Sequence, residues 1–268
     1  DATVDVGYSC VLINTRTSDL IFNSIPMEGS GNAKVTAFES SNNAVINSFD
    51  ITWDATGSAA GTAAISSDPT LVFPNLFTPS TSWGSKLGVV RVDLVPTNGS
   101  FARDVLATGT YTFFLYPLNT AAGSTHTVLS GTANQGVLLP VKCAAAVSPC
   151  SATITLGGAT NSSKYFMRLQ ALYSSVQVTV KNVKDAASTA LTLQNGQAVI
   201  DVTGRSSDVY RRVQVRLPVL TNGVTASFTL QTADSICKRL LGAPAPAAST
   251  NSATGDTAAD TGVCVLNN

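Results

Sequence analysis

Histidine, charged residues and long apolar runs are all scarce in this sequence. Its 268 residues include one histidine and only 12% charged residues, and the formal net charge is zero. A single imidazole leaves no partner set for zinc, and the absence of a positive net charge argues against a nucleic-acid binder. No run of about 20 apolar residues occurs, so we expect no membrane-spanning helix.

What remains is an apolar chain rich in hydroxyl and amide side chains. Apolar residues make up 44% of it, enough for a sizeable core, and the polar surface must come largely from Ser, Thr, Asn and Gln. The few charges are unevenly spread, with a net charge of −5 in residues 1–60 and +4 in residues 205–239. These segments are either solvated faces or acidic and basic ends that meet between subunits of a head-to-tail assembly.

The sequence has five cysteines and no CxxC motif. They are Cys10, Cys143, Cys150, Cys237 and Cys264. Without a metal-binding spacing, disulfide bonds explain them better, and disulfides indicate an oxidising, extracellular setting. The odd number leaves at least one free thiol or an intermolecular bond.

Apolar and polar residues alternate along several segments. Val90, Val92 and Leu94 enclose Arg91 and Asp93, so one face of this segment is apolar and the other polar. The same alternation recurs in residues 4–12, 176–181, 212–217 and 226–230. A period of two is typical of antiparallel strands that have one face on a core and one in water.

Turn signals agree with this pattern. Asn98-Gly99, Asn195-Gly196 and Asn222-Gly223 lie between apolar runs and predict tight hairpins, because Asn-Gly tolerates positive φ. The sequence therefore predicts an all-β, mainly antiparallel fold of immunoglobulin-like β-sandwich domains. One short C-terminal helix is expected at residues 234–242, with Asp234 as its N-cap and Gly242 just past its end.

A small, proline-containing segment at residues 143–150 predicts a domain boundary. We expect an N-terminal β-sandwich domain at residues 1–142 and a C-terminal β-domain at residues 151–242. Residues 243–268 form a low-complexity tail, for which a disulfide would provide an anchor.

Catalytic signatures are missing. A Ser-His-Asp triad would need His126, which lies in a polar segment, and no G-x-S-x-G motif occurs. Asp50 and Asp54 flank Trp53, a combination also seen where enzymes or lectins hold sugars. A core or interface tryptophan between two strand-end aspartates is the simpler interpretation. We therefore expect no enzyme activity, no cofactor and no metal.

Three arginines stand out near the end of the alternating segments. Arg212 and Arg216 are expected to share a strand face with Gln214, while Arg211 points to the other face. Two arginines on one face make a weak nucleic-acid site. Salt bridges to neighbouring strands or subunits are the better interpretation, which makes Arg211, Arg212 and Arg216 candidate interface residues.

The stretch from residue 165 to residue 238 also carries a family resemblance. It contains YFMRLQALYSSVQVTV, IDVTGRSSDVYRRVQVRLP and ADSICKR, and it resembles the C-terminal part of type IV pilin-like surface proteins, of the minor-pilin type, from ultrasmall host-attached bacteria. Residues 8–25, 49–57, 83–96 and 109–117 look like the same family in the same order. The resemblance covers nearly the whole chain except the tail.

The resemblance implies a subunit without an active site, at the bacterial cell surface. Such subunits carry a globular β-domain outward on an N-terminal helix inserted in a membrane or filament, and that helix is absent from this chain. Cys237 and Cys264 resemble the disulfide-bounded C-terminal region of type IV pilins. On that analogy they bond to each other, and Cys10, Cys143 and Cys150 share one further bond.

These observations lead to one functional hypothesis and two alternatives. The hypothesis is a non-enzymatic extracellular structural subunit that joins other subunits in a surface filament for attachment, motility or uptake. The first alternative is an adhesin module that contacts a host receptor or glycan through Trp53, Trp83 or the tail loop. The second is a β-sandwich subunit of a capsid or shell.

Overall fold

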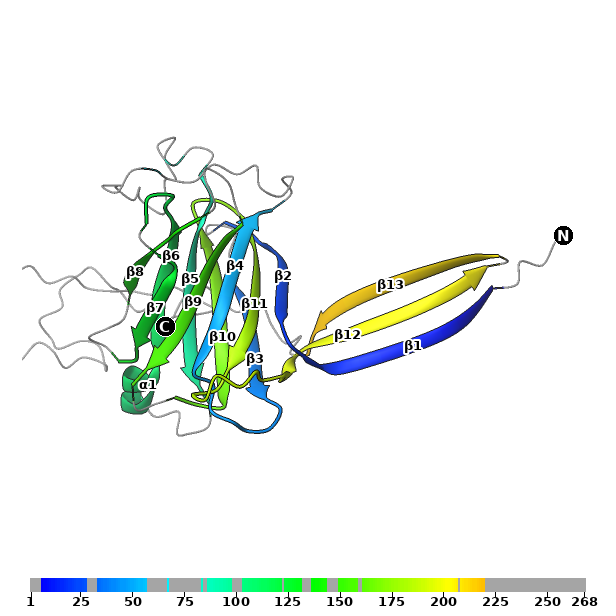
Figure 1. Ribbon diagram of the computed structural model, residues 1–268, viewed down its shortest axis with the longest axis horizontal. Helices are drawn as coiled ribbons and strands as arrows, with labels where there is room; N and C mark the ends of the chain where they lie inside the picture. The colour runs from blue at the N-terminus through cyan, green and yellow to red at the C-terminus, as the bar shows by residue number, and fades with distance from the viewer. Residues whose placement is uncertain are drawn as a thin grey trace, which may run out of the picture. The chain divides into compact units, whose positions relative to one another are not determined.

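The chain folds into two facing β-sheets, one of which continues into a three-stranded extension (Figure 1). The computed structural model describes residues 6–27, 33–56, 67, 83, 86–97, 103–121, 123–131, 136–143, 149–158, 161–206 and 208–219. All of them belong to one compact unit, Asp1–Ser227. We call the facing sheets the sandwich, and the extension, made of residues 6–14, 198–206 and 209–218, the arm.

The described elements are mostly strands. They are β1 (Val6–Thr17), β2 (Leu20–Ile25), β3 (Lys34–Ser40), β4 (Ser48–Ala55), β5 (Val89–Pro96), α1 (Arg103–Gly109), β6 (Tyr111–Pro117), β7 (Thr125–Leu129), β8 (Val137–Val141), β9 (Cys150–Gly157), β10 (Lys164–Leu172), β11 (Val176–Lys184), β12 (Leu193–Ser206) and β13 (Val209–Pro218). The prediction of a mainly antiparallel all-β sandwich is confirmed.

The eight-stranded sheet has the order β1-β12-β3-β10-β5-β6-β8, with β13 on the other side of β12. The five-stranded sheet has the order β2-β11-β4-β9-β7. Pairing is antiparallel except between β6 and β8 and between β7 and β9. Chain neighbours β1 and β2 therefore lie in different sheets.

Alternation along each strand of the sandwich delivers one apolar face to a shared core. On β4, Phe49, Ile51 and Trp53 are buried, and on β5 Val92 and Leu94 are buried. The core also contains Leu20, Tyr111, Phe113, Leu115, Ile154, Tyr165, Met167, Leu169, Val178 and Val180. The two sheets are thus held together by aliphatic and aromatic packing, the dominant favourable term in folding.

The boundary predicted at residues 143–150 does not separate two domains. Strands from both sides of it pair in each sheet, since β10 pairs with β3 and β5 while β11 pairs with β2 and β4. Cys143 and Cys150 instead form a disulfide that joins the end of β8, in one sheet, to the start of β9, in the other. The segment connects two layers of one sandwich.

The described residues contain one short helix, α1, in a segment where the sequence predicted none. α1 spans only seven residues and ends at Gly109, where Thr110 returns its N–H and its hydroxyl to the carbonyl of Leu106 at 3.0 and 2.7 Å. A segment of two turns is too short to display a helical period. The helix predicted at residues 234–242 and the tail at 243–268 lie outside the described residues.

Candidate assembly surface

The arm is an antiparallel three-stranded sheet whose two faces differ in chemistry. β12 pairs with β1 on one side and with β13 on the other, in register from residue to residue. Residues directly opposite each other point to the same face. The rows Val11–Val202–Val213 and Ile13–Ile200–Val215 and the pair Ala198–Leu217 therefore lie on one face. We call this set of eight side chains the aliphatic face.

The aliphatic face is open to solvent. Its outer strands carry Val11, Ile13, Val213, Val215 and Leu217, which are 58%, 63%, 57%, 42% and 46% exposed. Nine of the fourteen exposed large apolar residues in the described part of the chain lie on β1, on β13 or directly after it. Contiguous exposed apolar surface of this kind marks interaction sites in soluble proteins.

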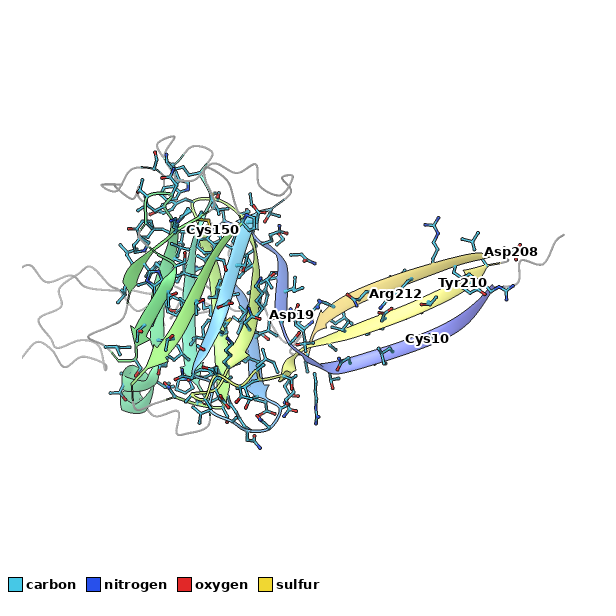
Figure 2. The ribbon with its side chains drawn as sticks, viewed as in Figure 1. Cys10, Asp19, Cys150, Asp208, Tyr210 and Arg212 are labelled. Carbon is cyan, nitrogen blue, oxygen red and sulfur yellow. A yellow bond between two sulfur atoms is a disulfide. The ribbon has the colours of Figure 1, made fainter. Side chains whose placement is uncertain are left out.

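The opposite face of the arm is polar and internally paired. Arg212 lies on β13 of the arm (Figure 2). The Asp201 carboxylate accepts hydrogen bonds from Arg212 Nε at 2.8 and 3.0 Å and is also contacted by Arg212 Nη2. These hydrogen bonds hold the pKa of Asp201 below its usual value, and the partner raises the pKa of Arg212. Gln214 lies beside them at 3.5 Å from the same carboxylate. The polar groups of this face thus bond to one another, as on an ordinary solvent-exposed protein surface.

The three arginines predicted at an interface divide between these faces as expected. Arg212 and Arg216 share the polar face with Gln214, and Arg211 lies on the other side of β13, past the end of the aliphatic face. Arg216 forms an ion pair with Asp19 at 3.2 Å, and Arg212 pairs with Asp201. Both ion pairs connect neighbouring strands or turns of the same chain. A contact of Arg211 with another subunit stays a prediction.

At the base of the arm, the side-chain amide of Gln197 bonds to the backbone of β2, as a neighbouring strand would. The Ile21 N–H donates to Gln197 Oε1 at 2.9 Å, and Gln197 Nε2 donates to the Ile21 carbonyl at 2.7 Å. Gln197 is buried, so both hydrogen bonds are shielded from water. They connect β12 of one sheet to β2 of the other where the arm begins.

Asn195-Gly196 is a second feature of the base of the arm. The prediction of a hairpin at this dipeptide is wrong. Both residues lie inside β12, with Asn195 at φ 64°, and the register with β1 shifts at this point. A Cβ on Gly196 would lie 2.7 Å from Leu20 Cδ2 and 3.3 Å from Phe38 Cβ. The dipeptide thus makes a bulge that lets β12 leave β3 and enter the arm.

Both edges of the arm are strands, and the edge formed by β1 is weakly protected. From Cys10 to Ile13 it carries no charge and no proline, the residues that usually prevent edge-to-edge pairing. Cys10 is exposed and unbonded, so of the three cysteines expected to share one bond, Cys143 and Cys150 form it. The predicted bond between Cys237 and Cys264 lies outside the described residues.

The tryptophans predicted as ligand contacts are both buried. Trp53 is 1% exposed and donates from Nε1 to the Gly88 carbonyl at 3.0 Å, across the two sheets. Trp83 is 2% exposed and stacks on Tyr173 with ring centroids 4.7 Å apart. Trp53 lies in the main core, as its interpretation as a core residue predicts, and Trp83 lies in a smaller apolar cluster. Neither ring is exposed for the ligand contact of the adhesin alternative.

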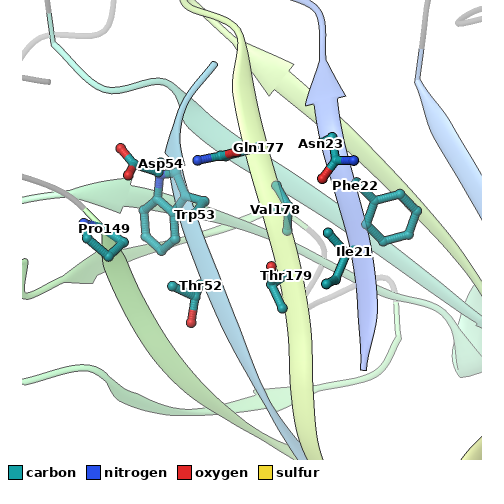
Figure 3. Close-up of a pocket in the computed structure, with 10 residues that line it drawn as sticks. All are labelled: Ile21, Phe22, Asn23, Thr52, Trp53, Asp54, Pro149, Gln177, Val178 and Thr179. Atoms are coloured by element: carbon teal, nitrogen blue, oxygen red, sulfur yellow. The ribbon is translucent and has the colours of Figure 1, made fainter. Parts of the chain in front are cut away.

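A shallow groove of about 230 Å³ lies over β2, β4 and β11 near Trp53 (Figure 3). Thr52, Asp54, Gln177 and Thr179 contribute polar groups to it. Asp50, the other aspartate beside Trp53, is occupied elsewhere, accepting from Thr153 Oγ1 at 2.7 Å and from Asn182 Nδ2 at 2.7 Å. Asp50 thus bonds to β9 and β11, and only Asp54 of the two aspartates lines the groove.

His126 lies on β7 and is half-buried. Desolvation lowers the pKa of His126, and a hydrogen bond with the backbone of Pro140 opposes this shift. In the described ranges, no three His, Cys, Asp or Glu side chains gather closely enough to hold a metal ion. No helix within these ranges has the length and apolar character to cross a membrane.

Comparison with protein-family models, with curated protein sequences and with solved structures finds no match to this chain. No family is therefore assigned to it. The feature that distinguishes this chain is the arm, which has one internally paired polar face and one exposed aliphatic face. The disulfide between Cys143 and Cys150 is compatible with an extracellular protein.

Proposed function

We propose that this chain is a non-enzymatic structural subunit of an extracellular bacterial surface filament of the pilin-like kind, and that it works by contact with other subunits. The single observation that carries the proposal is the open aliphatic face of the arm. A soluble domain that exposes a contiguous apolar sheet face has a surface for association rather than for chemistry.

The arm is also a fixed part of the fold, as an assembly element must be. Gln197 and the Arg216–Asp19 ion pair fasten its base, and Arg212 with Asp201 spans β12 and β13. A docking surface that is already ordered loses less conformational entropy on binding. The intersheet disulfide and the low share of charged residues further support a role outside the cell.

Two other functions have less support. Of the contacts expected for an adhesin, Trp53 and Trp83 are buried, and the tail loop lies outside the described residues. A Ser-His-Asp triad would have to use His126, and in the described ranges no three His, Cys, Asp or Glu side chains gather to hold a metal ion. A capsid or shell subunit shares the need for association, so the form of the assembly must separate it from a filament.

Electron microscopy of cells that make this protein tests the proposal. Gold-labelled antibodies against the chain should decorate fibres on the cell surface, and deletion of the gene should remove the fibres or the attachment they support. Label confined to the cytoplasm, or closed shells in place of fibres, would contradict it. A His126→Gln variant should leave the fibres unchanged.

A further inference from the structure

The aliphatic face needs a cover, and its composition restricts what that cover is. Two complete rows of branched aliphatic side chains cross all three strands, and the pair Ala198–Leu217 extends them toward the base. Among the eight side chains of this face none carries a charge or a hydrogen-bonding group. An antiparallel sheet with such a face packs it against a second apolar layer.

We propose that the cover is the same face of a second copy of this chain, so that two arms form a six-stranded sandwich between subunits. This inference rests on the proposed function, since it names the partner of an assembly subunit. Two sheets pack face to face about 10 Å apart with their strands inclined by about 30°. A face made only of aliphatic side chains is complementary to itself, as a two-fold interface requires.

The size of the whole arm fits this partner. Three strands spaced by about 4.8 Å and about ten residues long give the arm a sheet of roughly 14 by 30 Å, and the aliphatic face occupies the half of it nearer the base. Two arms packed along their whole length remove on the order of 1,000 Å² of accessible surface, which is the lower limit for a specific interface.

Face packing and edge pairing give different expectations at two adjacent residues of β1. Ile13 is 63% exposed and lies on the aliphatic face, whereas Leu12 is 59% exposed and lies on the polar face beside Asp201. The two side chains are isomers on the same strand with nearly equal exposure. The same substitution at both positions therefore isolates the choice of face.

Analytical ultracentrifugation of the whole chain, from micromolar to hundred-micromolar concentration, tests the inference. The unaltered chain should form a reversible dimer. Ile13→Lys should raise the dissociation constant roughly 100-fold, because each dimer would bury two unpaired charges. Leu12→Lys should change it by less than about twofold, because the new charge faces solvent and Asp201.

Circular dichroism melts of both variants check that the fold is retained, and Ile13→Thr provides a milder change at the same site, for which we expect a roughly tenfold loss. An unaltered chain that stays monomeric overturns the inference and leaves the face to another segment or protein. Equal losses for Leu12→Lys and Ile13→Lys overturn it in favour of pairing at the edge of β1.

The two proposals fail separately. Surface fibres that form equally well with the Ile13→Lys chain would support a filament subunit and reject arm-to-arm packing. A dimer that is sensitive to Ile13→Lys, from a protein that makes no fibres, would support the packing and reject the filament.

Discussion

The sandwich and the arm are built from the same alternating sequence pattern but end in opposite states. On β11, Val176, Val178 and Val180 are buried to 1% exposure or less, whereas on β13 Val213 and Val215 are 57% and 42% exposed. In the sandwich a second sheet covers the apolar face, and in the arm the described residues provide no such layer. Alternation therefore encodes which face is apolar, and the neighbours decide whether that face becomes a core or an interface.

The largest contrast is expected for apolar truncation in the two regions. Trp53→Ala should lower the free energy of unfolding by about 3–5 kcal/mol, because a fully buried ring and its hydrogen bond to Gly88 are lost. Val213→Ala should change it by less than about 0.5 kcal/mol at concentrations where the chain is monomeric. Urea unfolding followed by tryptophan fluorescence and circular dichroism measures both, and equal losses would remove the distinction between core and arm.

The disulfide should stabilise the sandwich and not the arm. Replacing both Cys143 and Cys150 by alanine should cost about 2–3 kcal/mol, the loop-closure term for so short a loop. The exchange rates of the arm amides should stay as they are in the unaltered chain, while those of β8 and β9 rise. A rise in the arm as large as the rise in β8 and β9 would show that the two regions do not respond independently.

The base of the arm should respond to loss of the buried amide. Gln197→Leu leaves the N–H and carbonyl of Ile21 without partners and should cost about 2 kcal/mol. The loss should appear as faster amide exchange at Ile21 and in the first residues of the arm. Gln214→Leu, on the exposed polar face, is the matched control and should cost less than about 0.5 kcal/mol.

The smallest expected effects concern how the free energy of unfolding depends on pH, which should differ between the arm and the sandwich. Asp201, in the arm, has a lowered pKa because Arg212 hydrogen-bonds its carboxylate. Its stabilisation is therefore complete above the unfolded value of about 3.9 and is lost as pH falls through the lower folded value. Asp201→Asn should flatten the decline of the urea midpoint below about pH 4, and an unchanged decline would show that the pair contributes nothing.

His126, in the sandwich, should act at higher pH. Burial lowers its pKa, so the folded chain binds the proton less readily than the unfolded chain. Stability is then complete above about pH 6.5 and declines as pH falls through the folded value. His126→Gln should remove this decline below about pH 6.5, and Asp201→Asn should leave it unchanged.

Local pattern sufficed for the strands and for the faces of the arm. The alternation around Val92, Val178 and Val213 predicted strands that the structure contains, and it placed Arg212 and Arg216 on one face with Arg211 on the other. In residues 165–173, Phe166, Leu169 and Tyr173 also fit one face of a helix, so the local pattern permits either a helix or a strand. These residues lie almost entirely in β10, where hydrogen bonds from β3 and β5 on both sides settle the choice.

The pairing of strands that are far apart in the chain could not be predicted from local sequence patterns. The predicted boundary at residues 143–150 follows local composition, but β10 to β12 return to pair with β1 to β5, and no local signal records that return. Asn195-Gly196 carries a genuine positive-φ signal that serves a bulge rather than a hairpin. The sequence did not predict the open aliphatic face, because alternation alone implies a core beneath every apolar face. Only the structure shows which apolar strand faces have an opposing layer.

The way the arm enters the sandwich determines how tension would pass through the molecule. β1 runs on into β2 of the five-stranded sheet, while the other end of β12 pairs with β3 of the eight-stranded sheet. A pull along the arm thus reaches both layers at once and stretches the hydrogen bonds between β1 and β12 together, in shear, instead of breaking them one by one. A chain connected in this manner resists a pull along the arm with several hydrogen bonds at once.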